Sequence, residues 1–227
     1  MPAVESLLQH IAALEHRLGL VEDREAIERL QCQYGFYLDN RMWQEVGDLF
    51  AGHDASIEIG RRGNYVGKER IHRFLHDVLG QGRWGLLKDE IINHIQLQMV
   101  TTVAPDRLTA KTRSRAIVQG NSPPGTGSLL WAEGIYENEY VKEAGVWKIK
   151  RLWWVPTFYV QMVGMDKAAF QSAPVSEAFP PDGPSAPQDA ALGRSFIPFH
   201  YVHPTTGAVV PSPGVPRGSE HTRGASP

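Results

Sequence analysis

The chain of 227 residues has a single cysteine, Cys32, and no long uninterrupted hydrophobic segment. One cysteine cannot form an intramolecular disulfide, so we expect a cytoplasmic protein rather than a disulfide-stabilised secreted one. We interpret Cys32 as a small buried apolar residue. The apolar runs are too short to span a membrane, and Glu5, His10 and Glu15 interrupt the N-terminal hydrophobic pattern, which disfavours a signal peptide.

An excess of charge of one sign is also missing. Lys and Arg total 23 against 25 Asp and Glu, so the formal net charge is −2 and no basic stripe indicates a nucleic-acid partner. His72 and His76 are four residues apart, but a third ligand is missing, so we predict no metal site. There is no nucleotide-binding loop and no Ser-His-Asp order, and we expect no cofactor.

Residues 4–21 have the apolar pattern of a short coiled-coil helix. The apolar residues recur at alternating steps of three and four, over about two and a half heptads: Val4, Leu7, Ile11, Leu14, Leu18 and Val21. A helix this short is marginal alone, so we expect it to pack on the domain or on a second copy. Gly19 predicts a break before the next helix. We therefore expect a homo-oligomer, either a dimer or a trimer.

The rest of the chain is organised around residues 23–50. A helix is predicted to begin near Asp23 and to bury one face; that face carries Ile27, Leu30, Tyr34 and Tyr37. Asp39 follows in the last turn, where the helix dipole disfavours a carboxylate, so it needs a partner or a function. The alternatives are that Asp39 or Asn40 caps the next helix, and that Tyr34 is an ordinary core aromatic.

Two further helices and two short strands are expected up to Gly80, and four long strand-like segments follow from residue 88. We predict an α+β domain over residues 22–165, in which three N-terminal helices pack on a curved mixed or antiparallel sheet and form a cone-shaped barrel with a pocket. Residues 1–21 form the N-terminal helix. Residues 166–227 are a Pro-rich C-terminal extension, which we expect to dock partly, across a pocket mouth, and to end in disorder.

Strand alternation predicts which side chains share a face. In the last strand, Trp147, Ile149, Arg151 and Trp153 are expected on one side. Arg151 would then lie among apolar neighbours and need a partner, which is either a strand carboxylate such as Glu133 or the substrate. On an earlier strand, the arginines are expected outside and the small residues inside: Arg113 and Arg115, against Thr112, Ser114 and Ala116.

Five short segments keep the order and spacing of a known family over about residues 22–160. They are residues 34–43 (YGFYLDNRMW), 67–71 (GKERI), 93–95 (NHI), 134–136 (GIY) and 145–149 (GVWKI). The pattern resembles the SnoaL-like group of the nuclear-transport-factor-two-like superfamily. The resemblance implies a cone-shaped α+β fold with its pocket between the first helices and the sheet.

In dehydratases of that superfamily, such as scytalone dehydratase and the bile-acid dehydratase, a tyrosine and an aspartate from the first helix region meet a strand histidine. Tyr34, Asp39 and His94 fall at these positions, so the resemblance implies that they are catalytic. It also implies that Arg151 binds substrate. The second histidine of scytalone dehydratase has no counterpart on the strand with the two arginines. We further expect Tyr37, Tyr136 and Trp153 to contact the substrate.

These residues favour a cofactor-independent lyase that uses acid–base catalysis in a hydrophobic pocket. The long N-terminal helix and the FHYVHP segment of the C-terminal extension also look like the lyases that act on lignin-derived diaryl compounds. The expected reaction is therefore loss of water, of formaldehyde or of both from a hydroxylated aromatic molecule, with no nucleic acid or membrane as partner. The alternatives are an isomerase or cyclase of the ketosteroid-isomerase type and a non-catalytic small-molecule-binding module.

Overall fold

The computed structural model describes residues 2–121, 124–164, 176–182, 188–189, 194–195 and 199–210. Its helices are α1 (Pro2–Asp39), α2 (Trp43–Asp48), the 3-10 helix η1 (Gly60–Arg62), α3 (Lys68–Arg73) and the π-helix η2 (Phe74–Leu79). The main strands are β1 (Ser56–Ile59), β2 (Asn64–Val66), β3 (Ile92–Val103), β4 (Thr109–Gly120), β5 (Ser128–Glu143) and β6 (Val146–Val163). A separate short hairpin consists of β7 (Gln188–Asp189) and β8 (Arg194–Ser195).

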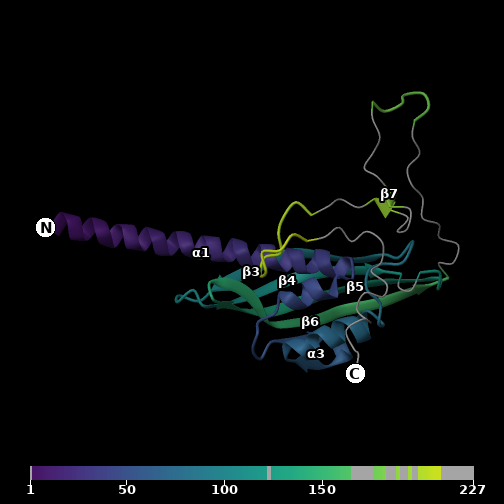
Figure 1. Cartoon of the computed structure of the whole chain (residues 1–227), viewed down its shortest axis with the longest axis horizontal. Helices are drawn as coiled ribbons and strands as arrows, with labels where there is room; N and C mark the ends of the chain where they lie inside the picture. Colours follow the sequence, from purple (N-terminus) through teal and green to yellow (C-terminus); the bar gives the residue numbers. More distant parts are fainter. Residues whose placement is uncertain are drawn as a thin grey trace, which may run out of the picture.

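Strands β1 to β6 form one mixed sheet in the order β2-β1-β6-β5-β4-β3. All neighbours are antiparallel except β1 and β6, which run parallel. The sheet is open, so its two edge strands do not close a barrel. Helix α1 packs on β3 and β6, and its N-terminal half projects beyond the sheet (Figure 1). The predicted α+β class is confirmed.

The two helices expected on either side of Gly19 are one continuous helix. Glycine in a helix costs only about 1 kcal/mol relative to alanine, and the contacts of the next turn offset this cost. The guanidinium of Arg107 lies against Gly19. Asp23 does not cap a helix but is buried, and it accepts hydrogen bonds from Arg107, Lys142 and Trp147. These bonds hold α1 to the sheet where a break was predicted.

An irregularity in β6 reverses which side chains face inward. The pairing with β5 shifts between Ile149 and Arg151, so β6 contains one extra residue there. Ile149 is buried before this bulge, whereas Leu152 and Trp154 are buried after it. Because side chains alternate along a strand, Arg151 and Trp153 lie on the opposite side. The predicted shared face therefore ends at the bulge.

The inner wall of β4 agrees with the prediction. Thr112, Ser114 and Ala116 are buried, while Arg113 and Arg115 form ion pairs with Glu137 and Glu133 on the other face. Cys32, by contrast, is exposed, because it lies on the side of α1 that faces away from the sheet. No helix in the described ranges is long and apolar enough to cross a membrane.

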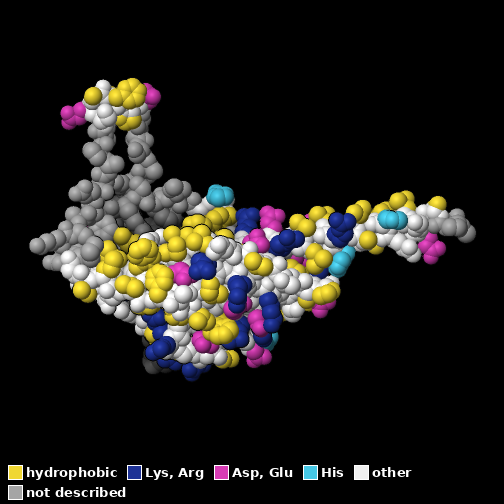
Figure 2. Space-filling view, turned by 180° about the vertical axis from the view of Figure 1, so that it is seen from behind, with side chains coloured by type: hydrophobic (Ala, Val, Ile, Leu, Met, Phe, Trp, Pro, Cys, Tyr) yellow, Lys and Arg dark blue, Asp and Glu magenta, His cyan; other side chains and the backbone are white. Residues whose placement is uncertain are grey.

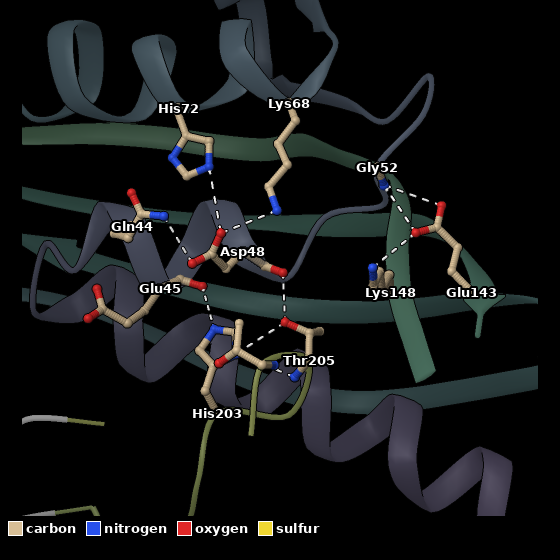
Figure 3. A network of polar contacts seen from close by, with 11 residues as sticks. Gln44, Glu45, Asp48, Gly52, Lys68, His72, Glu143, Lys148, His203 and Thr205 are labelled. Carbon is tan, nitrogen blue, oxygen red and sulfur yellow. Dashed lines mark hydrogen bonds and ion pairs between the residues drawn. The ribbon is translucent and has the colours of Figure 1, made fainter. Parts of the chain in front are cut away.

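Residues 199–210 of the C-terminal extension dock on the helices. His203 Nε2 lies 2.9 Å from the carbonyl oxygen of Glu45, and the Thr205 hydroxyl donates to the carbonyl of Asp48 at 2.7 Å (Figure 3). The segment 199–210 thus covers the junction of α1 and α2. The predicted disorder of the last dozen residues concerns 216–227, which lie outside the described residues.

Figure 3 also places the His72 side chain at the carboxylate of Asp48, beside Lys68. His76 instead contacts Asp77. The two histidines that are four residues apart in the sequence therefore have different acidic neighbours.

Candidate active site

A cavity of about 330 Å³ lies between the end of α1, the short helices and the inner face of the sheet. Its lining residues come from α1 and α2, from η1 and η2, from strands β1 and β3 to β6, and from the loops after α1 and η2. They include Leu38, Arg41, Trp43, Arg62, His94, Leu130, Tyr136, Trp154 and Tyr159. A volume of this size accommodates a small organic ligand, and both apolar and hydrogen-bonding groups face it.

Asp39 and His94 meet at this cavity. Asp39 is the last residue of α1, and His94 is the third residue of β3. The approach is close because Gly35 has no side chain: a Cβ there would lie 3.1 Å from the carbonyl oxygen of His94. The Nδ1 atom of His94 is 2.9 Å from Oδ1 of Asp39, and the two side chains are only 15% and 17% exposed.

This geometry determines what the imidazole is able to do. The carboxylate of Asp39 engages Nδ1 and does not itself line the cavity, whereas His94 does. The other ring nitrogen, Nε2, is left to exchange a proton with a bound molecule. A carboxylate in this position orients the ring, as acid–base catalysis requires.

Tyr34 lies behind the cavity wall, and Tyr136 forms part of the wall. Tyr34 is fully buried and is not a lining residue, and its ring meets that of Tyr136 edge-on at 6.1 Å between centroids. Burial, followed by the effect of Tyr136, raises the pKa of Tyr34 well above its ordinary value. Burial also raises the pKa of Tyr136. Both hydroxyls therefore stay protonated, and Tyr136 is the one that a ligand can reach.

Three residues expected to contact substrate lie outside the cavity. Tyr37 is covered by the docked segment, because its ring stacks on His203 at 5.4 Å and meets Phe199 edge-on at 5.7 Å. Arg151 and Trp153 lie beyond the bulge on the outer side of β6, where the guanidinium sits 4.5 Å from the indole centroid. The described contact of Arg151 is therefore with an aromatic ring, while Glu133 pairs with Arg115.

The ion pair of Arg41 and Glu90 was not foreseen. Arg41 follows Asp39 by two residues, adopts a φ of +52° and is 2% exposed. Its Nη2 donates to Glu90 at 2.7 Å, and Arg83 also binds this carboxylate. The sequence holds two signals for this pair. Arg41 belongs to the family-like segment 34–43, and Glu90 lies in the loop just before β3.

Trp154 was missed for a different reason. It lines the cavity next to Tyr136, with 6.4 Å between the ring centroids. Gly134 on β5 provides the room, because a Cβ there would lie 2.6 Å from the indole. The sequence shows two adjacent tryptophans in the middle of β6, Trp153 and Trp154, but only the position of the bulge decides which of the two points inward.

A family model described as a SnoaL-like domain matches residues 20–152. A type 2 LinA hexachlorocyclohexane dehydrochlorinase is similar in structure, with a TM-score of 0.56 and 20% identity over 70% of this chain and 97% of that one. A Novosphingobium aromaticivorans protein provisionally described as a scytalone dehydratase gives 0.51 and 20%, over 63% and 89%.

An NTF2-like protein with a cystatin-like fold from the same organism has a TM-score of 0.52 and 19% identity, over 63% of this chain and 88% of that one. No curated protein matches the chain. The solved structures establish the shared fold, and the family model covers more than half of the sequence. The chain therefore belongs to the SnoaL-like domain family.

Proposed function

We propose that the protein is a cofactor-independent lyase that eliminates water, formaldehyde or both from a hydroxylated aromatic compound of the lignin-derived diaryl type. The observation that carries the proposal is the hydrogen-bonded pair of Asp39 and His94 at the cavity. The names of two structural neighbours, a dehydrochlorinase and a provisional dehydratase, describe eliminations and support the same reaction class.

The chemistry uses His94 twice. Protonated Nε2 gives its proton to the benzylic hydroxyl, which leaves as water, and loss of the proton of the para phenol completes a neutral quinone methide. Neutral Nε2 then takes the proton of a hydroxymethyl group. The C–C bond to that group breaks, formaldehyde leaves, and the electron pair restores the aromatic ring, whose oxygen regains a proton.

The cavity suits such a molecule in other respects. Trp154 and Leu130 offer apolar surface, and the protonated hydroxyl of Tyr136 can donate to a substrate oxygen. Arg62 is cationic, and the residues that line the described cavity include no Asp or Glu. Phenolic oxygens, which become more negative as the hydroxyl proton is lost, fit this polarity.

The isomerase alternative receives less support from the geometry. It needs a carboxylate that removes a proton from carbon, whereas Asp39 lies behind His94 and outside the lining. In a pure binding module, a histidine held in this way would have no chemical task. Solvent-proton exchange into an enone without loss of water or formaldehyde would favour the isomerase.

The test is incubation of the purified protein, without added cofactor, with p-hydroxybenzylic diaryl diols. Mass analysis and a formaldehyde assay then follow the products. Loss of both fragments supports the C–C lyase, and loss of water alone supports a dehydratase. The matched control substrates carry a methyl group on the phenol oxygen, which prevents quinone methide formation and should abolish turnover. No turnover of any free phenol would contradict the proposal.

A further inference from the structure

The N-terminal half of α1 carries an exposed apolar seam. The helix projects from the body of the protein (Figure 1), and apolar side chains lie along the projecting part (Figure 2). The seam residues are between 42% and 62% exposed: Val4, Leu7, Ile11, Leu14, Leu18 and Val21. They occupy alternating a and d positions of a heptad repeat. So short a helix is marginal without a partner.

The body of the protein lies on the other side of the helix. Asp23 is buried against the sheet, whereas Val21 is 53% exposed. Two residues along a helix are about 200° apart, so these side chains point in nearly opposite directions. A second helix can therefore lie along the seam without meeting the sheet. Glu25 and Glu28 occupy the next a and d positions, so the apolar seam ends at Val21.

The flanking charges select an orientation. With Val4 at position a, the g positions hold His10, Arg17 and Arg24, and the e positions hold Leu8, Glu15 and Glu22. In a parallel pair, each g residue faces the e residue of the next heptad on the other helix, which opposes Arg17 to Glu22. In an antiparallel pair, g residues face g residues and e residues face e residues, so Arg17 could not pair with Glu22.

Three charged residues beside the seam have no oppositely charged partner within their own helix. Helical ion pairs form between residues three or four apart. Neither Arg17 nor Glu22, nor Glu15, has an oppositely charged residue at those distances. In the first two heptads, position a carries β-branched Val4 and Ile11 and position d carries Leu7 and Leu14, a combination that favours two strands; in the third, Leu18 is at a and Val21 at d.

We propose that residues 4–21 form a parallel two-stranded coiled coil with a second copy of this chain. The seam provides the buried contact, and the Arg17–Glu22 pairs fix orientation and register. Both bodies then lie at the same end of the coil, one on each side.

Cross-linking of the full chain tests the orientation. In a Cys32→Ser background, oxidised Leu7→Cys should form a covalent dimer, because equal d positions lie side by side in a parallel coil. A mixture of Leu7→Cys and Leu18→Cys chains should give almost no mixed dimer. Mixed cross-linking without self-cross-linking would mean an antiparallel pair and would overturn the proposal.

The mass in solution tests the seam. The wild-type chain should be a dimer by sedimentation, and Ile11→Asp/Leu14→Asp should be a monomer with unchanged melting of the body. Gln9→Asp/His16→Asp, on the outer face of the coil, should remain dimeric. Arg17→Glu or Glu22→Arg alone should weaken the dimer at least tenfold, and the double exchange should restore it. A wild-type monomer or trimer, or a dimer indifferent to the double aspartate variant, would refute the coiled coil.

Discussion

The imidazole of His94 is held by the carboxylate of Asp39 across 2.9 Å, at the point where the longest helix ends against the first long strand. An acidic side chain at a helix C-terminus is disfavoured by the helix dipole by about 0.3–1 kcal/mol, and this bond offsets that cost when the ring is protonated. Helix and sheet are thereby joined at the cavity.

His94→Ala and Asp39→Asn should each reduce turnover of a reactive diaryl diol by roughly a hundredfold or more, the usual contribution of an acid–base group. The melting temperature should change little. Asn93→Ala is the matched control, because Asn93 precedes His94 on β3 but does not line the cavity. Unfolding of both variants, with specific activity retained in the folded fraction, would show that the pair is structural.

Trp154→Phe should raise KM for an aromatic substrate several-fold, because it removes apolar surface from the cavity. Trp153→Phe changes a neighbouring side chain of the same kind on the opposite face of β6 and should leave KM unaltered. Steady-state kinetics on the two variants measure the difference. An equal effect of both substitutions would contradict the position assigned to the bulge.

Glu90→Gln should lower the free energy of unfolding by about 3–5 kcal/mol, because it leaves the buried charge of Arg41 uncompensated. The two side chains are 2% and 0% exposed. Glu137→Gln is the control: its ion pair with Arg113 is on the surface and should contribute less than about 1 kcal/mol. Urea unfolding measures the free energy of unfolding of both variants. A similar loss of stability in the two would show that the buried ion pair contributes no more than the surface one.

Stability in acid should depend on Asp23. Burial alone would raise the pKa of this carboxyl, but hydrogen bonds from Arg107, Lys142 and Trp147 outweigh it and lower the pKa to about 2. The unfolded value is about 3.9, so the stabilisation is complete above that pH and is lost as the pH falls towards 2.

Asp23→Asn should therefore destabilise the protein at pH 7 by about 1–2 kcal/mol and make unfolding less dependent on pH between about 4 and 2. Chemical denaturation at a series of pH values measures this slope. Glu25→Gln, at an exposed position two residues further along α1, should keep the wild-type slope. An unchanged slope in Asp23→Asn would contradict the assigned pKa.

Local patterns predicted the elements and the meeting of Asp39 with His94, because helix periodicity, strand alternation and family-like segments each depend on residues close in sequence. The prediction that Arg151 and Trp153 share a face with Trp147 and Ile149 was wrong. One extra residue in β6 reverses the alternation of side chains, and no residue type marks its position. Tyr37 was misplaced for a longer-range reason: the residues that cover it lie about 160 positions away.

That separation has a kinetic consequence. The bond between His203 and Glu45 joins residues 158 positions apart, so it closes a very long loop. The helices and the antiparallel strands connect residues much nearer in sequence and should form earlier. During folding, Tyr37 therefore stays open to water until segment 199–210 arrives, and its burial reports completion of the native state.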